Sequence, residues 1–143
     1  MDENLNRARE ILINGGYTCV IIKDDIEYNS KERGVKPLLD WIEQDINFEE
    51  AYVCDKVVGK AAAFLYVLMK VKAIYAVVLS QPAYDVLQRY NIDVSYDSLV
   101  PAIRNRDNTG FCPMESSVMG INDPTEAKER IEATRAELLK KGK

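Results

Sequence analysis

The sequence predicts an α/β domain with a mixed β-sheet, on three observations. Helix-like and strand-like segments alternate along the chain, which is the pattern of a layered α/β fold. The apolar run at 73–79 (AIYAVVL) lacks polar alternation and is typical of a central strand buried on both faces. A tight turn at Asp24-Asp25 between two β-prone runs predicts a hairpin, so part of the sheet is antiparallel.

The first part of the chain is expected to give a helix, a hairpin, a second helix and a strand. Apolar residues at helical spacing start at Leu5, and Gly15-Gly16 ends the helix that they form. Pro37 stands in the first turn of the second helix. The expected segments after the first helix are strands at 17–23 and 26–30, a helix over 34–44 and a strand at 51–54.

A buried helix is expected next. Asp55 stands where a helix N-cap belongs, and from 57 to 70 apolar residues occur on nearly every face. Gly59 inside this helix costs up to about 1 kcal/mol relative to alanine. We therefore expect close packing against a strand, or else a ligand, to compensate for Gly59.

The remaining elements follow from proline, glycine and capping signals. The residues from 97 to 111 give no clear pattern, whereas Asp123, Pro124 and Glu126 form the start of a last helix with a capping box. One face of that helix carries Ala127, Ile131, Thr134 and Leu138. The expected segments are a strand at 73–79, a helix over 81–90, a strand at 94–96, a short helix over 113–119 and the last helix over 124–140.

The composition excludes several classes of function. A chain of 143 residues suits one domain spanning 1–143, and the absence of histidine excludes Ser-His-Asp catalysis, Cys-His catalysis and most zinc chemistry. A net charge of −4 gives no indication of a positively charged surface that would bind nucleic acid. The polar N-terminus does not look like a signal peptide, and Lys60 and Lys70 interrupt the most apolar stretch, so no membrane contact is expected. Three scattered cysteines indicate reduced thiols and a cytoplasmic protein.

The order of these elements resembles the cytidine deaminase-like fold, in three layers (α/β/α). In that fold the buried helix begins with His-Ala-Glu or Cys-Ala-Glu, and the next helix begins with Pro-Cys-x-x-Cys. Here the two junctions read VCDKVVGK at 53–60 and LSQPAYDVL at 79–87. The proline is similar but the zinc ligands are missing, so the resemblance implies the fold without zinc-dependent deamination. Cys54 could replace one ligand, yet Cys19 and Cys112 lack the spacing to complete a site, and we expect neither a metal nor a cofactor.

Three strings resemble a bacterial family of uncharacterised proteins, domain of unknown function eighteen-ninety-three. They are GVKPLL at 34–39, DKVVGKAA at 55–62 and CPME at 112–115. The resemblance covers roughly residues 16 to 120. It implies a deaminase-like fold and supplies no activity.

Ligands of α/β folds gather where helix N-termini meet the carboxyl ends of strands, which here points to Asp55 and Ser80. We expect Asp55 to act mainly as a cap, with a place in the pocket as well. Lys56 and Lys60 lie beside it as candidate ligand-binding residues. Lys56 is expected to be solvated, and Lys60, in an apolar helix, must either extend to water or meet an anion.

A second candidate group surrounds Cys112. As the N-cap of a short helix, its thiolate would be favoured by the helix dipole, which makes it a candidate nucleophile as well as a small buried hydrophobe. Glu115 could reach back to the Cys112 backbone as in a capping box. Asn105 and Arg106 belong to a polar segment whose arginines could bind phosphate or carboxylate, or remain in a solvated loop.

Three functional hypotheses result. The first is a deaminase-like domain that binds a small-molecule ligand, such as a nucleotide-like compound, at the Asp55/Ser80 junction. The second is a cysteine-dependent enzyme that uses Cys112 as its nucleophile, with Lys60 or Arg106 stabilising an anion. The third is an interaction module that forms a homo-oligomer without catalysis.

Overall fold

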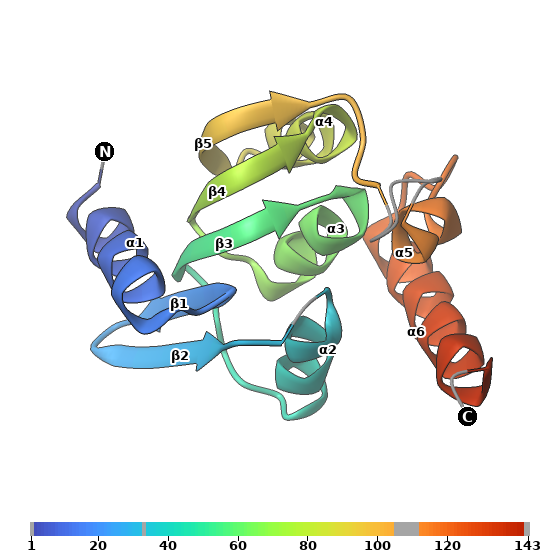
Figure 1. Cartoon of the computed structure of the whole chain (residues 1–143), viewed down its shortest axis with the longest axis horizontal. Coiled ribbons are helices and arrows are strands. Elements are labelled where there is room, and N and C mark those ends of the chain that lie inside the picture. Colours follow the sequence, from blue (N-terminus) through green and yellow to red (C-terminus); the bar gives the residue numbers. More distant parts are fainter. Residues whose placement is uncertain (1, 33, 105–111, 142–143) are drawn as a thin grey trace.

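A mixed β-sheet forms the centre of the molecule in the computed structural model, which describes residues 2–32, 34–104 and 112–141 (Figure 1). Within these ranges five strands lie in the order β2-β1-β3-β4-β5. The β1–β2 and β1–β3 pairs are antiparallel, and the β3–β4 and β4–β5 pairs are parallel. The strands are β1 (Cys19–Lys23), β2 (Ile26–Ser30), β3 (Tyr52–Val58), β4 (Ala73–Ser80) and β5 (Asp93–Val100).

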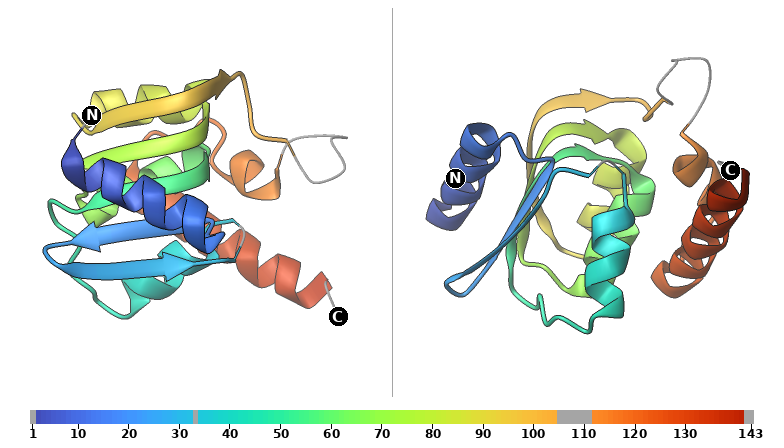
Figure 2. Two further views of the ribbon diagram at one scale, coloured as in Figure 1. Left: turned by 60° about the vertical axis from the view of Figure 1, so that its left-hand side comes forward. Right: turned by 60° about the horizontal axis from the view of Figure 1, so that its bottom comes forward.

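Helices cover both faces of this sheet (Figure 2). Helix α1 packs on β1, β3 and β4, while α2, α3 and α4 lie on the opposite face, and α6 packs against α3 from outside. The predicted three-layer α/β/α fold with a mixed sheet is therefore confirmed. The helices are α1 (Glu3–Gly15), α2 (Lys36–Glu43), α3 (Lys60–Met69), α4 (Gln81–Arg89), α5 (Pro113–Ser117) and α6 (Pro124–Lys141).

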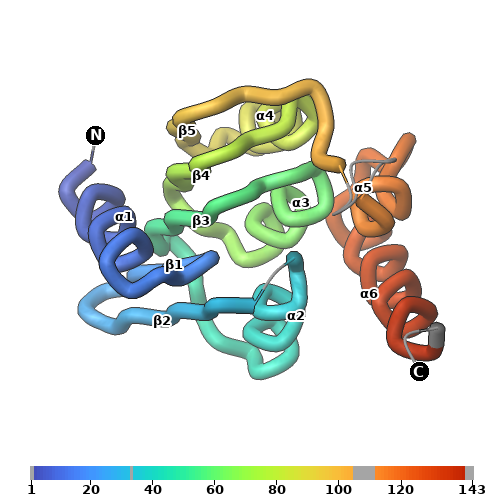
Figure 3. The backbone as a smooth tube through the Cα atoms, in the orientation of Figure 1, coloured from blue at the N-terminus to red at the C-terminus, as the bar shows by residue number. Residues whose placement is uncertain are grey.

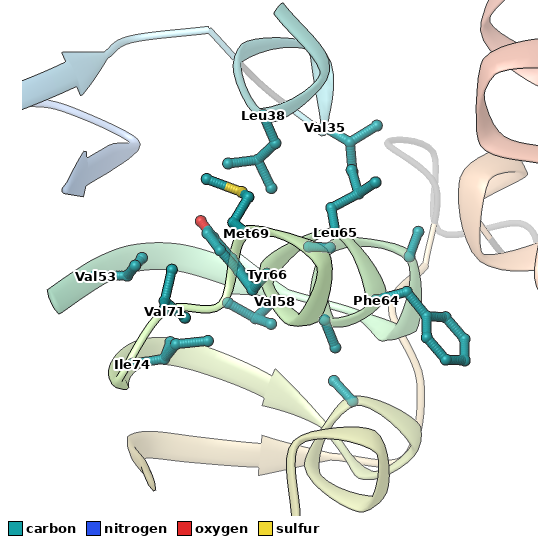
Figure 4. Close-up of a cluster of buried hydrophobic side chains, with 14 of the residues drawn as sticks. Val35, Leu38, Val53, Val58, Phe64, Leu65, Tyr66, Met69, Val71 and Ile74 are labelled. Carbon is teal, nitrogen blue, oxygen red and sulfur yellow. The ribbon is translucent and has the colours of Figure 1, made fainter. Parts of the chain in front are cut away.

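Each face of the sheet has its own apolar core, because side chains of a strand alternate between faces. Leu5, Ala8 and Leu12 of α1 pack in the smaller core. Helix α3 is the centre of the larger core and is apolar on nearly every side, since it lies between the sheet and α2, α4 and α6. In Figure 4, Tyr66 of this helix lies near Val53 and among other apolar side chains.

Local signals fix the element ends that the sequence predicts. Gly16 ends α1 in the left-handed conformation (φ 66°). Asp24, in the β1–β2 turn, also has a left-handed backbone conformation (φ 56°). At the start of α6, the Asp123 side chain accepts a hydrogen bond from the Glu126 N–H at 2.8 Å. Tracing the backbone shows α1 and α6 at opposite sides of the molecule (Figure 3). None of the described helices is long and apolar enough to cross a membrane.

The predicted boundary between β3 and α3 is wrong. The strand continues to Val58, Gly59 is the N-cap, and the helix begins at Lys60. Asp55 is therefore a strand residue, opposite Cys19 of β1 and Ala76 of β4. The cap signal at Asp55 is overridden because hydrogen bonding between β3 and β4 extends to the Val58–Leu79 pair. For the same reason β5 is longer than predicted and pairs with β4 up to Val100.

Candidate functional site

A pocket of about 790 Å³ lies where the carboxyl end of β3 meets the first turn of α3. Its other walls come from the start of β1, the segment before α2, the residues after β5, and α5. Most of these wall residues are apolar. The lining residues that the following argument uses are Cys19, Asp55, Lys56, Gly59, Cys112 and Glu115.

Asp55 gives this pocket a partly buried carboxyl group. Its Oδ2 accepts a hydrogen bond from the Tyr66 hydroxyl at 2.6 Å, and its Oδ1 accepts one from the Val57 N–H at 3.2 Å. Burial raises the pKa of Asp55 to about 7, while hydrogen bonds from the Tyr66 hydroxyl and from the Val57 and Lys56 N–H groups oppose that rise. Near neutral pH the Asp55 carboxyl can therefore both accept and release a proton.

Tyr66 connects Asp55 to a buried thiol. Its hydroxyl oxygen lies 3.3 Å from the Cys19 sulfur, and the two groups come from α3 and β1. Burial raises the pKa of Cys19 and the pKa of Tyr66 well above their ordinary values, so both groups stay protonated at neutral pH. Since Tyr66 donates to Asp55, Cys19 is the group that donates to Tyr66, and the chain of hydrogen bonds runs toward the Asp55 carboxylate.

Glu115 of α5 is bound to the start of α3. Its two carboxylate oxygens accept hydrogen bonds from the Lys60 and Ala61 N–H groups, at 2.7 and 2.9 Å. A Cβ atom on Gly59 would lie 2.3 Å from Glu115 Oε1, so only glycine leaves room for this contact. Burial raises the pKa of Glu115, and the two N–H donors together with the Lys60 charge oppose the rise. The prediction that Gly59 lies inside the helix and packs against a strand or a ligand is wrong, because Gly59 is the extended N-cap of α3 and its close neighbour is the Glu115 carboxylate.

Cys112 lies in the pocket wall and is half-buried, as the N-cap of α5. The predicted capping box is wrong, because Glu115 turns to α3 and the Cys112 N–H donates instead to the Ile103 carbonyl at 3.2 Å. Glu115 could not be assigned to α3 from sequence, since the contact spans 55 positions without a local pattern.

The other predicted site residues are not all brought together. Lys56 is exposed and lines the pocket, whereas Lys60 has its ammonium 5.7 Å from the Phe64 ring centroid and does not line it. Ser80 is fully buried as the N-cap of α4, where its Oγ accepts a hydrogen bond from the Ala83 N–H at 3.2 Å. It is absent from the pocket lining, which includes both Asp55 and Glu115. Asn105 and Arg106 lie outside the described residues.

Two contributors were missed by sequence reasoning. Tyr66 lies in the segment that the sequence predicts to be a helix with apolar residues on nearly every face, and Cys19 lies in a predicted strand. Cys19 lies beside Asp55 because the register of β1 and β3 pairs the two residues, and Tyr66 reaches Asp55 from α3. No local sequence pattern reveals either contact. Among the described residues, no group of three histidine, cysteine, aspartate or glutamate side chains could hold a metal ion.

Comparisons with known proteins identify the family. The family described as TM1506, domain of unknown function DUF1893, matches residues 7–134. The crystal structure of a DUF1893 family protein (TM1506) from Thermotoga maritima is 31% identical, covers 96% of this chain and 92% of that chain, and has a TM-score of 0.83. No curated protein matches the chain.

Two further solved structures are more distant. RibD from Acinetobacter baumannii is 16% identical over 65% of this chain and 34% of its own, with a TM-score of 0.44. A diaminohydroxyphosphoribosylaminopyrimidine deaminase/5-amino-6-(5-phosphoribosylamino)uracil reductase from Thermotoga maritima is 10% identical over 80% and 40%, with a TM-score of 0.44. The family match and the 31% identical structure, which agree over nearly the whole chain, show that this protein belongs to the DUF1893 family.

Proposed function

We propose that this protein binds a small organic molecule, such as a nucleotide-like compound, in the pocket beside Asp55. The observation that carries the proposal is a carboxyl group with a pKa of about 7 in a pocket of about 790 Å³. Ligand pockets of this size usually combine apolar walls with a few polar groups that orient the ligand. Asp55 has the position of such an orienting group.

The pocket walls support a ligand with a flat apolar body. Val35, Val57, Ile103 and Met114 line it, and these side chains suit the faces of an aromatic ring. Lys56 is exposed at the same pocket and offers a positive charge to a phosphate or carboxylate on the ligand. This combination favours a heterocycle that carries an acidic substituent.

Catalysis by Cys112 is the second hypothesis for the same pocket. Cys112 lines the pocket, so a ligand there would meet its thiol. A cysteine nucleophile needs a nearby base or cation to form its thiolate. Within the described chain the Cys112 sulfur has no hydrogen bond, and binding without covalent chemistry is therefore the function that the geometry favours.

A cytoplasmic location belongs to this proposal, since Cys19, Cys54 and Cys112 are free thiols.

Thermal unfolding in the presence of nucleobases, nucleosides and nucleoside monophosphates tests the proposal. We expect at least one compound to raise the Tm of the wild type and to have a smaller effect on Asp55→Asn. Asp97→Asn is the matched control, because Asp97 also accepts a hydrogen bond from a tyrosine, Tyr75, but does not line the pocket. A panel that leaves the wild-type Tm unchanged would contradict the proposal.

A further inference from the structure

The charged side chains of the pocket are arranged by depth. Among the described residues that line it, Lys56 and Arg104 carry positive charges, and both residues are exposed to solvent. Asp55 and Glu115 line the same pocket and are half-buried. The two positive charges therefore lie at the mouth of the pocket, and these two carboxyl groups lie deeper.

The carboxyl groups of the lining are held by contacts within the protein. The Glu115 carboxylate accepts hydrogen bonds from two backbone N–H groups at the start of α3. Asp55 accepts hydrogen bonds from the Tyr66 hydroxyl and from the backbone of β3. Glu32, the third carboxyl group of the described lining, lies 3.2 Å from the Lys36 ammonium. These donors partly offset the negative charge of the carboxyl groups, which reduces their repulsion of a bound anion.

Lys56 and Arg104 reach the pocket from opposite sides of β4. Lys56 belongs to β3, and Arg104 follows the end of β5 at Val100. Since β4 lies between these two strands, β3 and β5 are about 10 Å apart. Both side chains are long and flexible, so an ammonium and a guanidinium group can contact one anion from two sides. Lys56 forms no salt bridge with any described residue.

We propose that Lys56 and Arg104 together bind a phosphate monoester, so that the ligand is a heterocycle joined to a phosphate and not to a carboxylate. This inference rests on the proposed binding function and specifies its ligand class. A phosphate monoester carries a charge of about −1.5 to −2 at pH 7 and has three acceptor oxygens, enough for an ammonium and a two-bond guanidinium contact at once. A carboxylate has a single charge and two oxygens.

The arrangement of charges also fixes the direction in which the ligand binds. The phosphate lies at the mouth, because a phosphate beside Asp55 and Glu115 would be repelled by two carboxyl groups. The ring then lies deeper, against apolar wall residues such as Val35 and Met114. A pocket of about 790 Å³ has room for a ring, a connecting sugar and a phosphate.

Matched compounds that differ only in the charged group test the inference. Adenosine, cytidine, guanosine and uridine are each compared with the 5′-monophosphate and the 5′-carboxylate by isothermal titration calorimetry on the intact protein. We expect the monophosphate of the preferred nucleoside to bind at least about tenfold more tightly than the nucleoside, with the carboxylate between them. Raising NaCl from about 0.05 to about 0.5 M should remove most of this advantage, because exposed charges are screened by salt.

Single substitutions assign the advantage to the two cations. Lys56→Gln and Arg104→Gln should each weaken monophosphate binding by about fivefold and change nucleoside binding by less than about twofold. Lys56→Arg should keep the wild-type preference, since the charge and the donors remain. Lys72→Gln is the matched control, because it removes an exposed positive charge that does not line this pocket. The Tm of each variant without ligand checks its fold, and Lys56→Gln, at an exposed strand position, provides the test even if Arg104→Gln is unstable.

The outcomes separate this inference from the proposed function. A nucleoside or carboxylate that binds as tightly as the monophosphate would overturn the phosphate inference and leave ligand binding standing. A phosphate advantage that persists in Lys56→Gln, or that Lys72→Gln reduces equally, would overturn it as well. Failure of every nucleoside, carboxylate and monophosphate to bind would contradict both.

Discussion

The Glu115 carboxylate lies in the space that a side chain on residue 59 would need. A Cβ atom on Gly59 would lie 2.3 Å from Oε1 and 2.5 Å from Cδ of Glu115. Gly59 has φ −102° and ψ −177°, an ordinary extended conformation, so the glycine is required for space and not for backbone freedom. Together the two residues connect α5 to the first turn of α3 and shape one wall of the pocket.

Gly59→Ala should therefore destabilise the protein by displacing Glu115. Loss of the two charge-assisted hydrogen bonds gives an expected cost of about 2–4 kcal/mol in the free energy of unfolding, measured by urea denaturation. Glu115→Ala should cost a similar amount. The double variant should be no less stable than Glu115→Ala alone, because the cavity left by Glu115 accommodates the new Cβ. Additive costs would contradict the account.

Asp55 should make stability fall as pH rises. Its pKa is about 7 in the folded protein and near its ordinary value of about 4 in the unfolded chain, so between these values the folded state holds the extra proton. Stability due to Asp55 is then full below about pH 4 and is lost as pH rises through 7. Relative to the wild type, Asp55→Asn should gain roughly 2–3 kcal/mol between pH 5 and pH 8 in urea denaturation. A pH-independent difference would refute the assignment.

The three cysteines should differ in reactivity. Cys19 and Cys54 are 3% and 0% exposed, and burial raises the pKa of Cys54 to about 12, whereas Cys112 is half-buried beside the pocket. Iodoacetamide at pH 7 should therefore add one group to the folded protein, at Cys112, as read by peptide mass spectrometry. Cys112→Ala should stay unmodified over the same period. The hypothesis of a Cys112 nucleophile further requires a rate above that of free cysteine, and a slower rate would remove its basis.

Self-association is predicted to use the end of α6. The face formed by Ala127 and Ile131 is buried on α3 and its neighbours, but Leu138 and Leu139 are 41% and 61% exposed. Light scattering over a dilution series should show an oligomer of the wild type and a lower mass for Leu139→Lys. Ile13→Lys, which changes an exposed residue of α1, should keep the wild-type mass. A monomer at every concentration would contradict this prediction.

The sequence predicted the parts of the structure that local chemistry determines. The glycine pair at the end of α1, the aspartate turn of the hairpin and the Asp123 cap each act within a few residues, and the structure confirms all three. The sequence predicts Asp55 as a helix cap because an aspartate directly before an apolar helix is a typical N-cap. Only the pairing of β3 with β4 shows that the strand continues past Asp55. The contact of Asp55 with Tyr66 joins β3 to the helix that follows it, 11 positions further along, and the contact of Glu115 with Lys60 spans 55 positions. No periodicity or spacing in a single sequence reports such contacts.

Mapping a ligand onto the pocket tests the central claim most directly. Backbone amide resonances should be followed by ¹H–¹⁵N NMR while the compound that most raises the Tm is titrated into the wild type. We predict saturable shifts at Val57, Ala61 and Glu115, none at α1, and at least tenfold weaker binding to Asp55→Asn. Shifts confined to other surfaces, or equal affinity of the Asp55→Asn variant, would contradict a binding site at Asp55.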